Sequence, residues 1–123
     1  MEKYNKADIT GKIINAAIEV HKELGPHYME VTYQRALALE LKSHFSEFQR
    51  EVKIPVFYKG EQIDTRRVDF LIEDVVVEIK AKSAFEARDF EQLLSYLKAS
   101  NFRLGLLLNF GQETLKIKRM ING

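Results

Sequence analysis

Residues 67–82, which read RVDFLIEDVVVEIKAK, constrain the fold more than any other stretch of the chain. Two short apolar runs, Val68–Ile72 and Val75–Ile79, lie on either side of the polar pair Glu73-Asp74. Both runs are rich in Val, Ile and Phe and too short to form helices, so they predict a β-hairpin. A two-residue turn aligns the end of the first strand with the start of the second. A symmetric four-residue loop keeps that register, whereas a three-residue loop breaks it.

In this register Asp69 lies directly opposite Glu78. Strand alternation places both carboxylates on one face of the hairpin, together with Lys80. Directly opposed residues have Cβ atoms about 5 Å apart, so two carboxylates there repel by about 3 kcal/mol at an effective dielectric of about 20. A divalent cation turns this repulsion into binding, because hard cations prefer oxygen ligands. The pattern therefore indicates a metal site with an ammonium group beside it.

The same three charges also have a purely structural interpretation. Strands often carry charged residues on a solvated face, and Lys80 can neutralise Asp69 and Glu78 in an exposed ladder. Leu71 and Val76 share that face, which indicates that another part of the chain covers some of it. The hairpin alone leaves both interpretations open.

Composition narrows the class of protein without revealing its function. The 123 residues, 46% hydrophobic and 30% charged, are typical of a single soluble globular domain spanning residues 1–123. The chain has no cysteine, which excludes disulfides and fits a cytoplasmic location. No apolar stretch approaches the length of a membrane span, so no membrane partner is expected. The formal net charge of +1 provides no global basic field, so nucleic-acid binding must come from local clusters.

Helices and strands are predicted on both sides of the hairpin. The expected helices span residues 8–24, 28–43 and 84–99, and the expected strands outside the hairpin span 51–58, 104–110 and 114–121. Asp8 or Thr10 is expected to cap the first helix, and Pro55 favours an edge position for its strand. The apolar run 104–110 is typical of a buried strand that pairs in parallel, and Leu115 and Ile117 of the last strand are expected to face inward. We predict an α/β domain with a mixed sheet flanked by helices, in the order α-α-β-β-β-α-β-β.

The ordered set of motifs resembles the PD-(D/E)XK nuclease superfamily, in which an Asp is followed on the next strand by (D/E)-X-K. Asp69 and Glu78-Ile79-Lys80 match this pattern. From about residue 8 to residue 121 the chain is similar to the GxxExxY proteins, a small bacterial family within that superfamily. The other matching segments are VHKELGP at 20–26, EVTY at 30–33, QLLSYL at 92–97 and LGLLLNFG at 104–111. The resemblance implies a PD-(D/E)XK nuclease-like fold, also called restriction-endonuclease-like.

Two positions depart from the family pattern. His27 replaces the glycine that names the GxxExxY motif, so the loop before the second helix need not adopt the family's conformation. Val68 precedes Asp69 where a proline is typical, and superfamily members commonly allow this replacement.

The resemblance implies a metal centre and a catalytic amine. Asp69 and Glu78 would ligate Mg²⁺ or Mn²⁺, aided by the main-chain carbonyl of Ile79. Glu30 would be a further carboxylate ligand, direct or through water, although its spacing alone favours a role at the positive end of a helix dipole. Lys80 would orient or deprotonate the attacking water and offset phosphate charge.

The helix after the motif adds two candidates, and local cations add phosphate contacts. Gln92 matches a glutamine that often borders superfamily active sites, and Tyr96, one turn beyond it, is a candidate nucleic-acid-binding residue. The candidate phosphate-binding residues are Arg66, Arg67, Lys82 and Arg88. Taken singly, each of these cations is expected on a solvated surface. No helix-turn-helix or zinc finger is visible, so sequence-specific reading is not expected.

These observations and the resemblance predict a metal-dependent nuclease that hydrolyses phosphodiester bonds of nucleic acid, with DNA favoured over RNA. The alternative is a non-catalytic module with a nuclease fold that binds nucleic acid or a protein partner, and a pure scaffold is the third interpretation. A domain this small acting on a duplex is expected to pair as a homodimer.

Overall fold

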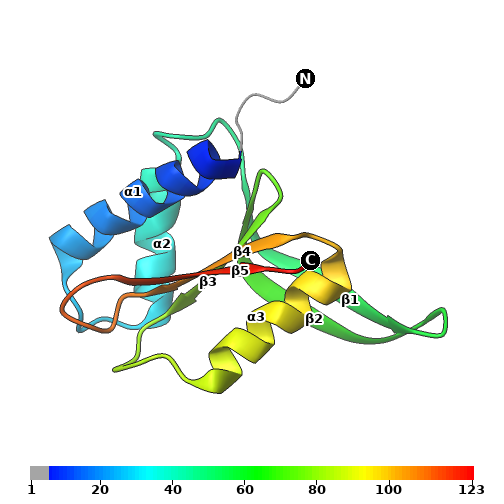
Figure 1. Ribbon diagram of the computed structural model, residues 1–123. Coiled ribbons are helices and arrows are strands. Elements are labelled where there is room, and N and C mark those ends of the chain that lie inside the picture. The colour runs from blue at the N-terminus through cyan, green and yellow to red at the C-terminus, as the bar shows by residue number, and fades with distance from the viewer. Residues whose placement is uncertain (1–5) are drawn as a thin grey trace.

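The computed structural model describes residues 6–123 and contains three helices and five strands in that part of the chain (Figure 1). The elements are α1 (Lys6–Leu24), α2 (Glu30–Leu41), β1 (Gln49–Tyr58), β2 (Glu61–Ile72), β3 (Val75–Lys80), α3 (Ala87–Ser100), β4 (Leu104–Asn109) and β5 (Lys116–Ile121). Their order is the predicted one, and the predicted α/β fold with a mixed sheet is confirmed.

The five strands form one sheet in the order β1-β2-β3-β4-β5. β1, β2 and β3 make the predicted antiparallel meander, and β4 pairs in parallel with β3, while β5 is antiparallel to β4. A parallel pair requires a long crossover, which α3 supplies. β3 and β4 are buried along nearly their whole length, as expected for strands covered on both faces.

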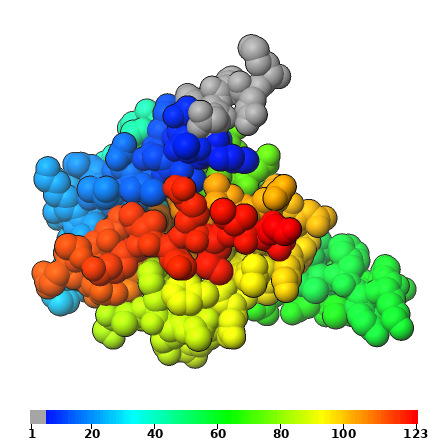
Figure 2. Space-filling model, viewed as in Figure 1, coloured from blue at the N-terminus to red at the C-terminus, as the bar shows by residue number. Residues whose placement is uncertain are grey.

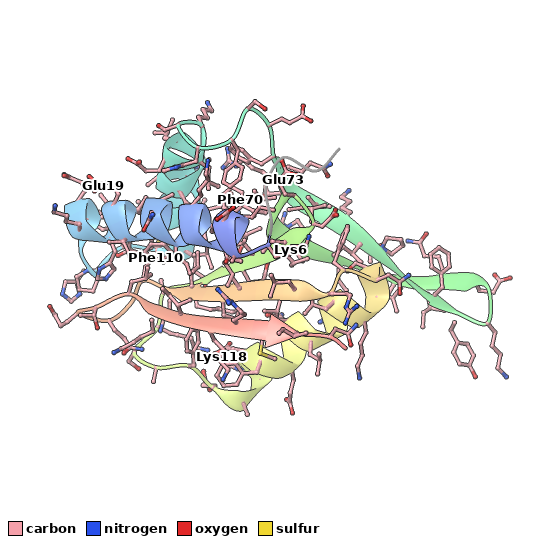
Figure 3. All side chains as sticks on the ribbon, turned by 45° about the horizontal axis from the view of Figure 1, so that its top comes forward. Lys6, Glu19, Phe70, Glu73, Phe110 and Lys118 are labelled. Carbon is pink, nitrogen blue, oxygen red and sulfur yellow. The ribbon has the colours of Figure 1, made fainter. Side chains whose placement is uncertain are left out.

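Helices cover both faces of the sheet. α1 and α2 pack on one face and α3 packs on the other (Figure 1). The larger core lies under α1 and α2 and includes Phe70 and Phe110, both of which Figure 3 labels next to α1. The smaller core lies under α3 and includes Val76, Leu93 and Leu107. Few polar side chains are buried between these cores, and Glu78 and Asp89 are two of them.

The β2–β3 hairpin has the predicted register. Glu73 and Asp74 form its turn with φ values of 48° and 71°. Two successive positive φ angles define a type I′ turn, which matches the twist of the flanking strands. Ile72 pairs with Val75 across this turn. The positions of the charged residues further along the hairpin follow from that pairing.

The first helix differs from its prediction at one end. Asp8 and Thr10 both lie inside α1, so the prediction that one of them caps the helix is wrong. The Thr10 hydroxyl instead donates to the Ala7 carbonyl at 3.1 Å, which is a bond within the helix. At the other end Gly25, with φ of 71°, follows the last helical residue. His27 does not have a positive φ, so the missing glycine causes no strain there.

β1 and β2 continue beyond the other strands as a two-stranded ribbon, which projects from the body of the molecule in Figure 2. This happens because β3 pairs only with the last three residues of β2. β1 is an edge strand, as Pro55 predicted. The tip of the ribbon exposes Phe57, Tyr58 and Ile63.

β5 forms the opposite edge of the sheet. Leu115, just before this strand, packs against the larger core, as expected. Ile117 is 38% exposed, so the prediction that it faces inward is wrong. The reason is that the helices leave this edge strand largely uncovered.

Candidate active site

Asp69 and Glu78 join the two strands of the hairpin through their side chains. The regular ladder ends where Phe70 pairs with Val77. Beyond it, the main-chain N–H of Asp69 donates to Glu78 Oε1 at 2.7 Å, and the main-chain N–H of Ile79 donates to Asp69 Oδ2 at 2.8 Å. The two carboxylates thus take the place of backbone acceptors, and the structure brings them together as the hairpin register predicted.

Glu78 is buried deeply enough for its charge to be costly. It is 6% exposed, whereas Asp69 is partly buried. Burial, followed by the negative charge of Asp69, raises the pKa of Glu78 to about 8. The hydrogen bond from the Asp69 main chain and the Lys80 ammonium act in the opposite direction and are outweighed. Burial and the neighbouring Asp69 charge therefore favour the protonated form of the Glu78 carboxyl.

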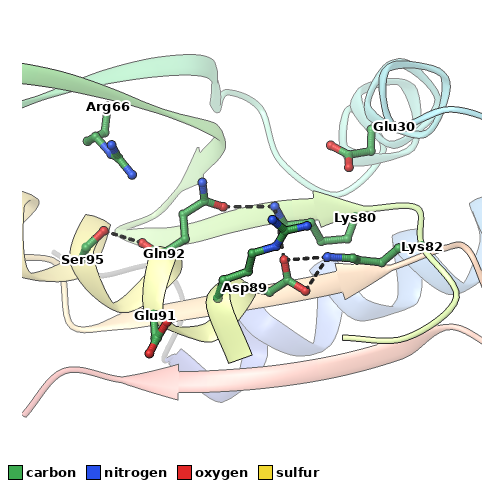
Figure 4. Close-up of a pocket in the computed structure, with 9 residues that line it drawn as sticks. Glu30, Arg66, Lys80, Lys82, Asp89, Glu91, Gln92 and Ser95 are labelled. Atoms are coloured by element: carbon green, nitrogen blue, oxygen red, sulfur yellow. Dashed lines mark hydrogen bonds and ion pairs between the residues drawn. The ribbon is translucent and has the colours of Figure 1, made fainter. Parts of the chain in front are cut away.

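An open cleft of about 690 Å³ lies beside the hairpin, where α2, β2, β3 and α3 meet (Figure 4). Its lining is strongly polar and consists of Glu30, Arg66, Lys80, Lys82, Arg88, Asp89, Glu91, Gln92 and Ser95. Figure 4 shows Glu30 and Arg66 at opposite ends, with Lys80 and Gln92 between them. Both signs of charge are present, with the acids Glu30, Asp89 and Glu91 beside the cations Arg66, Lys80, Lys82 and Arg88.

Lys80 and Gln92 form the middle of the cleft. Lys80 Nζ donates to Gln92 Oε1 at 3.0 Å and lies 3.8 Å from Asp89 Oδ1. Because one partner is neutral and the other is farther away, the ammonium is anchored on the α3 side and can still serve a ligand in the cleft. Lys80, which the resemblance placed at the attacking water, and Gln92, which it placed at the border of the active site, are therefore in contact with each other.

Asp89 is a site residue that the sequence analysis did not single out. It is 3% exposed and accepts two hydrogen bonds from Lys82 Nζ, at 3.0 and 2.9 Å. The main-chain N–H of Glu86 also donates to it at 2.8 Å, within a capping box at the start of α3. Burial alone would raise the pKa of Asp89, but these hydrogen bonds outweigh burial and lower it. Its position one turn before Gln92 is the signal that could have identified it.

Glu30 stands at the rim of the cleft as the first residue of α2. Partial removal from water raises the pKa of Glu30. The Lys80 ammonium lowers this pKa and the Asp69 charge raises it, but desolvation is the largest effect. The structure thus brings Glu30 to the cleft that Lys80 also lines. The position at a helix N-terminus also suits its negative charge, as the structural interpretation expected.

Three of the four candidate phosphate-binding cations line the cleft. Arg66, Lys82 and Arg88 do so, whereas Arg67 lies outside the lining and pairs with Glu51 at 3.3 Å. Tyr96 is buried, and the Arg66 guanidinium lies over its ring at 5.5 Å from the centroid, a cation–π contact. Tyr96 is not among the residues that line the cleft, and its role in binding nucleic acid stays a prediction.

The acidic residues do not form a closed metal centre. In the part of the chain that the structure describes, no group of three or more His, Cys, Asp or Glu side chains is arranged to hold an ion. Asp69 and Glu78 lie next to each other but do not line the cleft, whereas Glu30 does line it. Carboxylate and carbonyl oxygens fit the chemistry of Mg²⁺ or Mn²⁺. Both oxygens of Asp69 and one of Glu78 already accept hydrogen bonds, so an ion would use their remaining lone pairs.

The fold and the hairpin define the class of protein: a nuclease-type α/β domain, with Asp69 and Glu78-Ile79-Lys80 on adjacent strands. The sequence profile of the PD-(D/E)XK nuclease superfamily matches residues 7–120, and the chain belongs to this superfamily. Its members are generally dependent on a divalent metal and act on nucleic acid. Membership of the GxxExxY group stays a prediction.

Among solved structures, the crystal structure of SSO0001 is similar to this chain, with a TM-score of 0.54 and 16% sequence identity. The match covers 89% of this chain and 65% of that one, so the chain spans less than two thirds of its length. At this identity the likeness concerns the fold alone. A comparison with curated protein sequences finds no significant match.

Among the described residues, no helix is both long and apolar enough to cross a membrane.

Proposed function

We propose that this protein is a metal-dependent nuclease that hydrolyses phosphodiester bonds of nucleic acid, with DNA as the favoured substrate. The observation that carries the proposal is the pair formed by Asp69 and Glu78 across the β2–β3 hairpin, next to Lys80 at the cleft. Two facing carboxylates repel each other when both are ionised. They become useful where a cation and a phosphate must be brought together.

Asp69 and Glu78 would hold Mg²⁺ or Mn²⁺ together with the main-chain carbonyl of Ile79. Glu30 would contribute from across the cleft, directly or through water. An ion of this kind polarises a phosphoryl oxygen and lowers the pKa of a bound water. The membership of the superfamily supports this assignment, as does the raised pKa of Glu78, since a cation would replace the proton that this carboxyl otherwise retains.

The remaining cleft residues would bind and orient the substrate. Lys80, anchored by Gln92, would orient or deprotonate the attacking water and offset the charge of the phosphate. The cations Arg66, Lys82 and Arg88 would contact phosphates within the cleft. Arg67 would contact the nucleic acid only outside it. Homodimerisation and a cytoplasmic location, both expected from the sequence, remain predictions.

The metal site is tested by calorimetric titration with Mn²⁺. We expect the wild type to bind Mn²⁺ and Asp69→Ala and Glu78→Ala to lose binding. Glu61→Ala, which removes an exposed acid at the tip of the β1–β2 ribbon, serves as the matched control and should bind like the wild type. Equal Mn²⁺ affinity in the wild type and both site variants would contradict the proposal.

Activity is tested with supercoiled, linear and single-stranded DNA and with RNA, each in Mg²⁺, Mn²⁺ and EDTA. We expect cleavage that requires the metal and is lost in Lys80→Ala. The chain of hydrogen bonds through Asp69 and Glu78 also ties the hairpin without any ion, which favours a non-catalytic nucleic-acid-binding module as the second candidate. Binding that is indifferent to metal, with no cleavage of any substrate, would support that module instead.

A further inference from the structure

A relay of three side chains from β1, α2 and β2 ends on Asp69. Arg50 Nη2 donates to Gln34 Oε1 at 3.0 Å, and Gln34 Nε2 donates to Asp69 Oδ1 at 2.8 Å. Gln34 is 8% exposed and lies on the core-facing side of α2. Arg50, at the other end, is exposed on the edge strand. Neither residue belongs to the (D/E)-X-K pattern.

The hydrogen bonds of this relay run from Arg50 through Gln34 to Asp69, and the guanidinium group of Arg50 fixes this direction. A guanidinium group can only donate hydrogen bonds, so the Gln34 amide must turn its oxygen toward Arg50 and its nitrogen toward Asp69. The reversed amide would place N–H groups against the guanidinium and an oxygen against the carboxylate. Arg50 therefore selects the amide orientation in which Gln34 donates to Asp69.

The two oxygens of Asp69 are consequently held from opposite sides. Gln34 binds Oδ1, and the main-chain N–H of Ile79 binds Oδ2. A carboxylate held at both oxygens cannot rotate freely about its bond to Cβ. An apolar side chain at position 34 would pack in the core without the cost of burying an amide, so the amide has a polar task there.

We propose that Gln34 is a positioning residue for Asp69 and that Arg50 positions Gln34, so that the pair presets the Asp69 carboxylate to bind a divalent cation. This inference depends on the proposed function for the identity of the ligand. Partners that hold a metal-binding carboxylate through hydrogen bonds commonly contribute about 10- to 100-fold in metal affinity.

The test is a set of Mn²⁺ titrations on full-length variants. Gln34→Met keeps the volume of the side chain and removes the donor, and we expect it to weaken Mn²⁺ binding by up to about 100-fold. Arg50→Met should weaken binding by about tenfold. In the double variant, Arg50→Met should add nothing, because Arg50 acts only through Gln34. Lys53→Met, which removes an exposed cation from the same strand, should bind like the wild type.

Arg50 is exposed, so Arg50→Met keeps the test valid even where Gln34→Met unfolds. Wild-type affinity in both single variants, or additive effects in the double variant, would overturn the inference. If the wild type itself does not bind Mn²⁺, the proposed function fails.

The positioning of Asp69 by Gln34 is then tested by hydrogen exchange on the metal-free protein. The Gln34 side-chain amide should be protected from exchange in the wild type and lose protection in Asp69→Ala and Arg50→Met. An unprotected amide in the wild type would overturn it.

Discussion

The main-chain N–H of Asp69 donates a hydrogen bond of 2.7 Å to Glu78 Oε1, and so fixes the more deeply buried acid of the pair against its neighbouring strand. Burial and the charge of Asp69 raise the pKa of Glu78 to about 8. In the unfolded chain a glutamate titrates near pH 4.3, at about the value for a model peptide. Between these pH values the folded protein holds a proton that the unfolded chain has released.

The first prediction concerns stability against pH in EDTA. Because the folded state binds more protons, the free energy of unfolding should fall as the pH rises from 5 to 8, by at most about 1.4 kcal/mol per pH unit from this group. Glu78→Gln keeps the hydrogen-bond acceptor and cannot titrate, so its stability should vary less and exceed that of the wild type at pH 8. Urea unfolding at pH 5, 6, 7 and 8 measures the free energy of unfolding of the wild type and of Glu78→Gln. Parallel pH profiles for the two proteins would contradict the assignment.

The second prediction concerns protons released on metal binding. A cation that takes the place of the Glu78 proton should release it below pH 8, and Mn²⁺ affinity should therefore rise as the pH rises toward 8. Calorimetry at pH 7 in buffers of different ionisation enthalpy should report about one proton released, and close to none above pH 9. A binding enthalpy that does not depend on the buffer at pH 7 would contradict the replacement of a Glu78 proton by the cation.

The third prediction concerns Asp89. Asp89→Asn removes a buried charge that accepts hydrogen bonds from Lys82 and from the Glu86 main chain, so it should destabilise the protein by about 2 kcal/mol at pH 7. The pKa of Asp89 is lowered in the folded state, so this contribution is present above its ordinary pKa and is lost as the pH falls below it. The difference between wild type and variant should therefore shrink toward pH 3.

Thermal unfolding measures this effect. Glu91→Gln is the matched control, since it neutralises an exposed acid on the same helix and in the same cleft. Equal melting temperatures of Asp89→Asn and Glu91→Gln at pH 7 would show that the Asp89 network contributes nothing to stability.

The part of the site that the sequence predicted is local in the chain. The apposition of Asp69 and Glu78 depends only on strand alternation and on a two-residue turn, and both are properties of residues 67–82. The relay to Gln34 was not predicted, because it joins residues 35 positions apart. Its geometry depends on how α2 packs against the sheet, and no periodicity within α2 specifies that angle.

Exposure of the edge strands was predicted less well for a similar reason. Alternation in the last strand assigns its residues to two faces, but it does not tell how far α1 and α3 reach across them. Ile117 is exposed for this reason alone. The start of α1 was missed because Asp8 and Thr10 have the side chains of caps, whereas the helix continues through both.

The last prediction concerns Gly111, which follows β4 where the chain passes close to the end of the hairpin. A Cβ atom at this position would lie 2.3 Å from the main-chain nitrogen of Lys82 and 2.6 Å from the carbonyl carbon of Ala81. Both are backbone atoms, and Asn109 holds the Lys82 backbone in place: the Lys82 N–H donates to Asn109 Oδ1, and Asn109 Nδ2 donates to the Lys82 carbonyl, each at 3.0 Å. They cannot move aside without breaking those bonds. Gly111→Ala should therefore destabilise the protein by about 3 kcal/mol or more and displace Lys82 from the cleft.

Gly11→Ala is the matched control for this substitution. Gly11 lies within α1, and a Cβ atom there meets nothing within 4 Å. Alanine at that position should stabilise the protein by about 0.5 to 1 kcal/mol, because glycine is the poorer helix former. Urea unfolding of the two variants should thus give shifts of opposite sign. If Gly111→Ala instead has the same free energy of unfolding as the wild type, Gly111 does not approach the Lys82 backbone this closely in solution. The cleft is then not shaped as described.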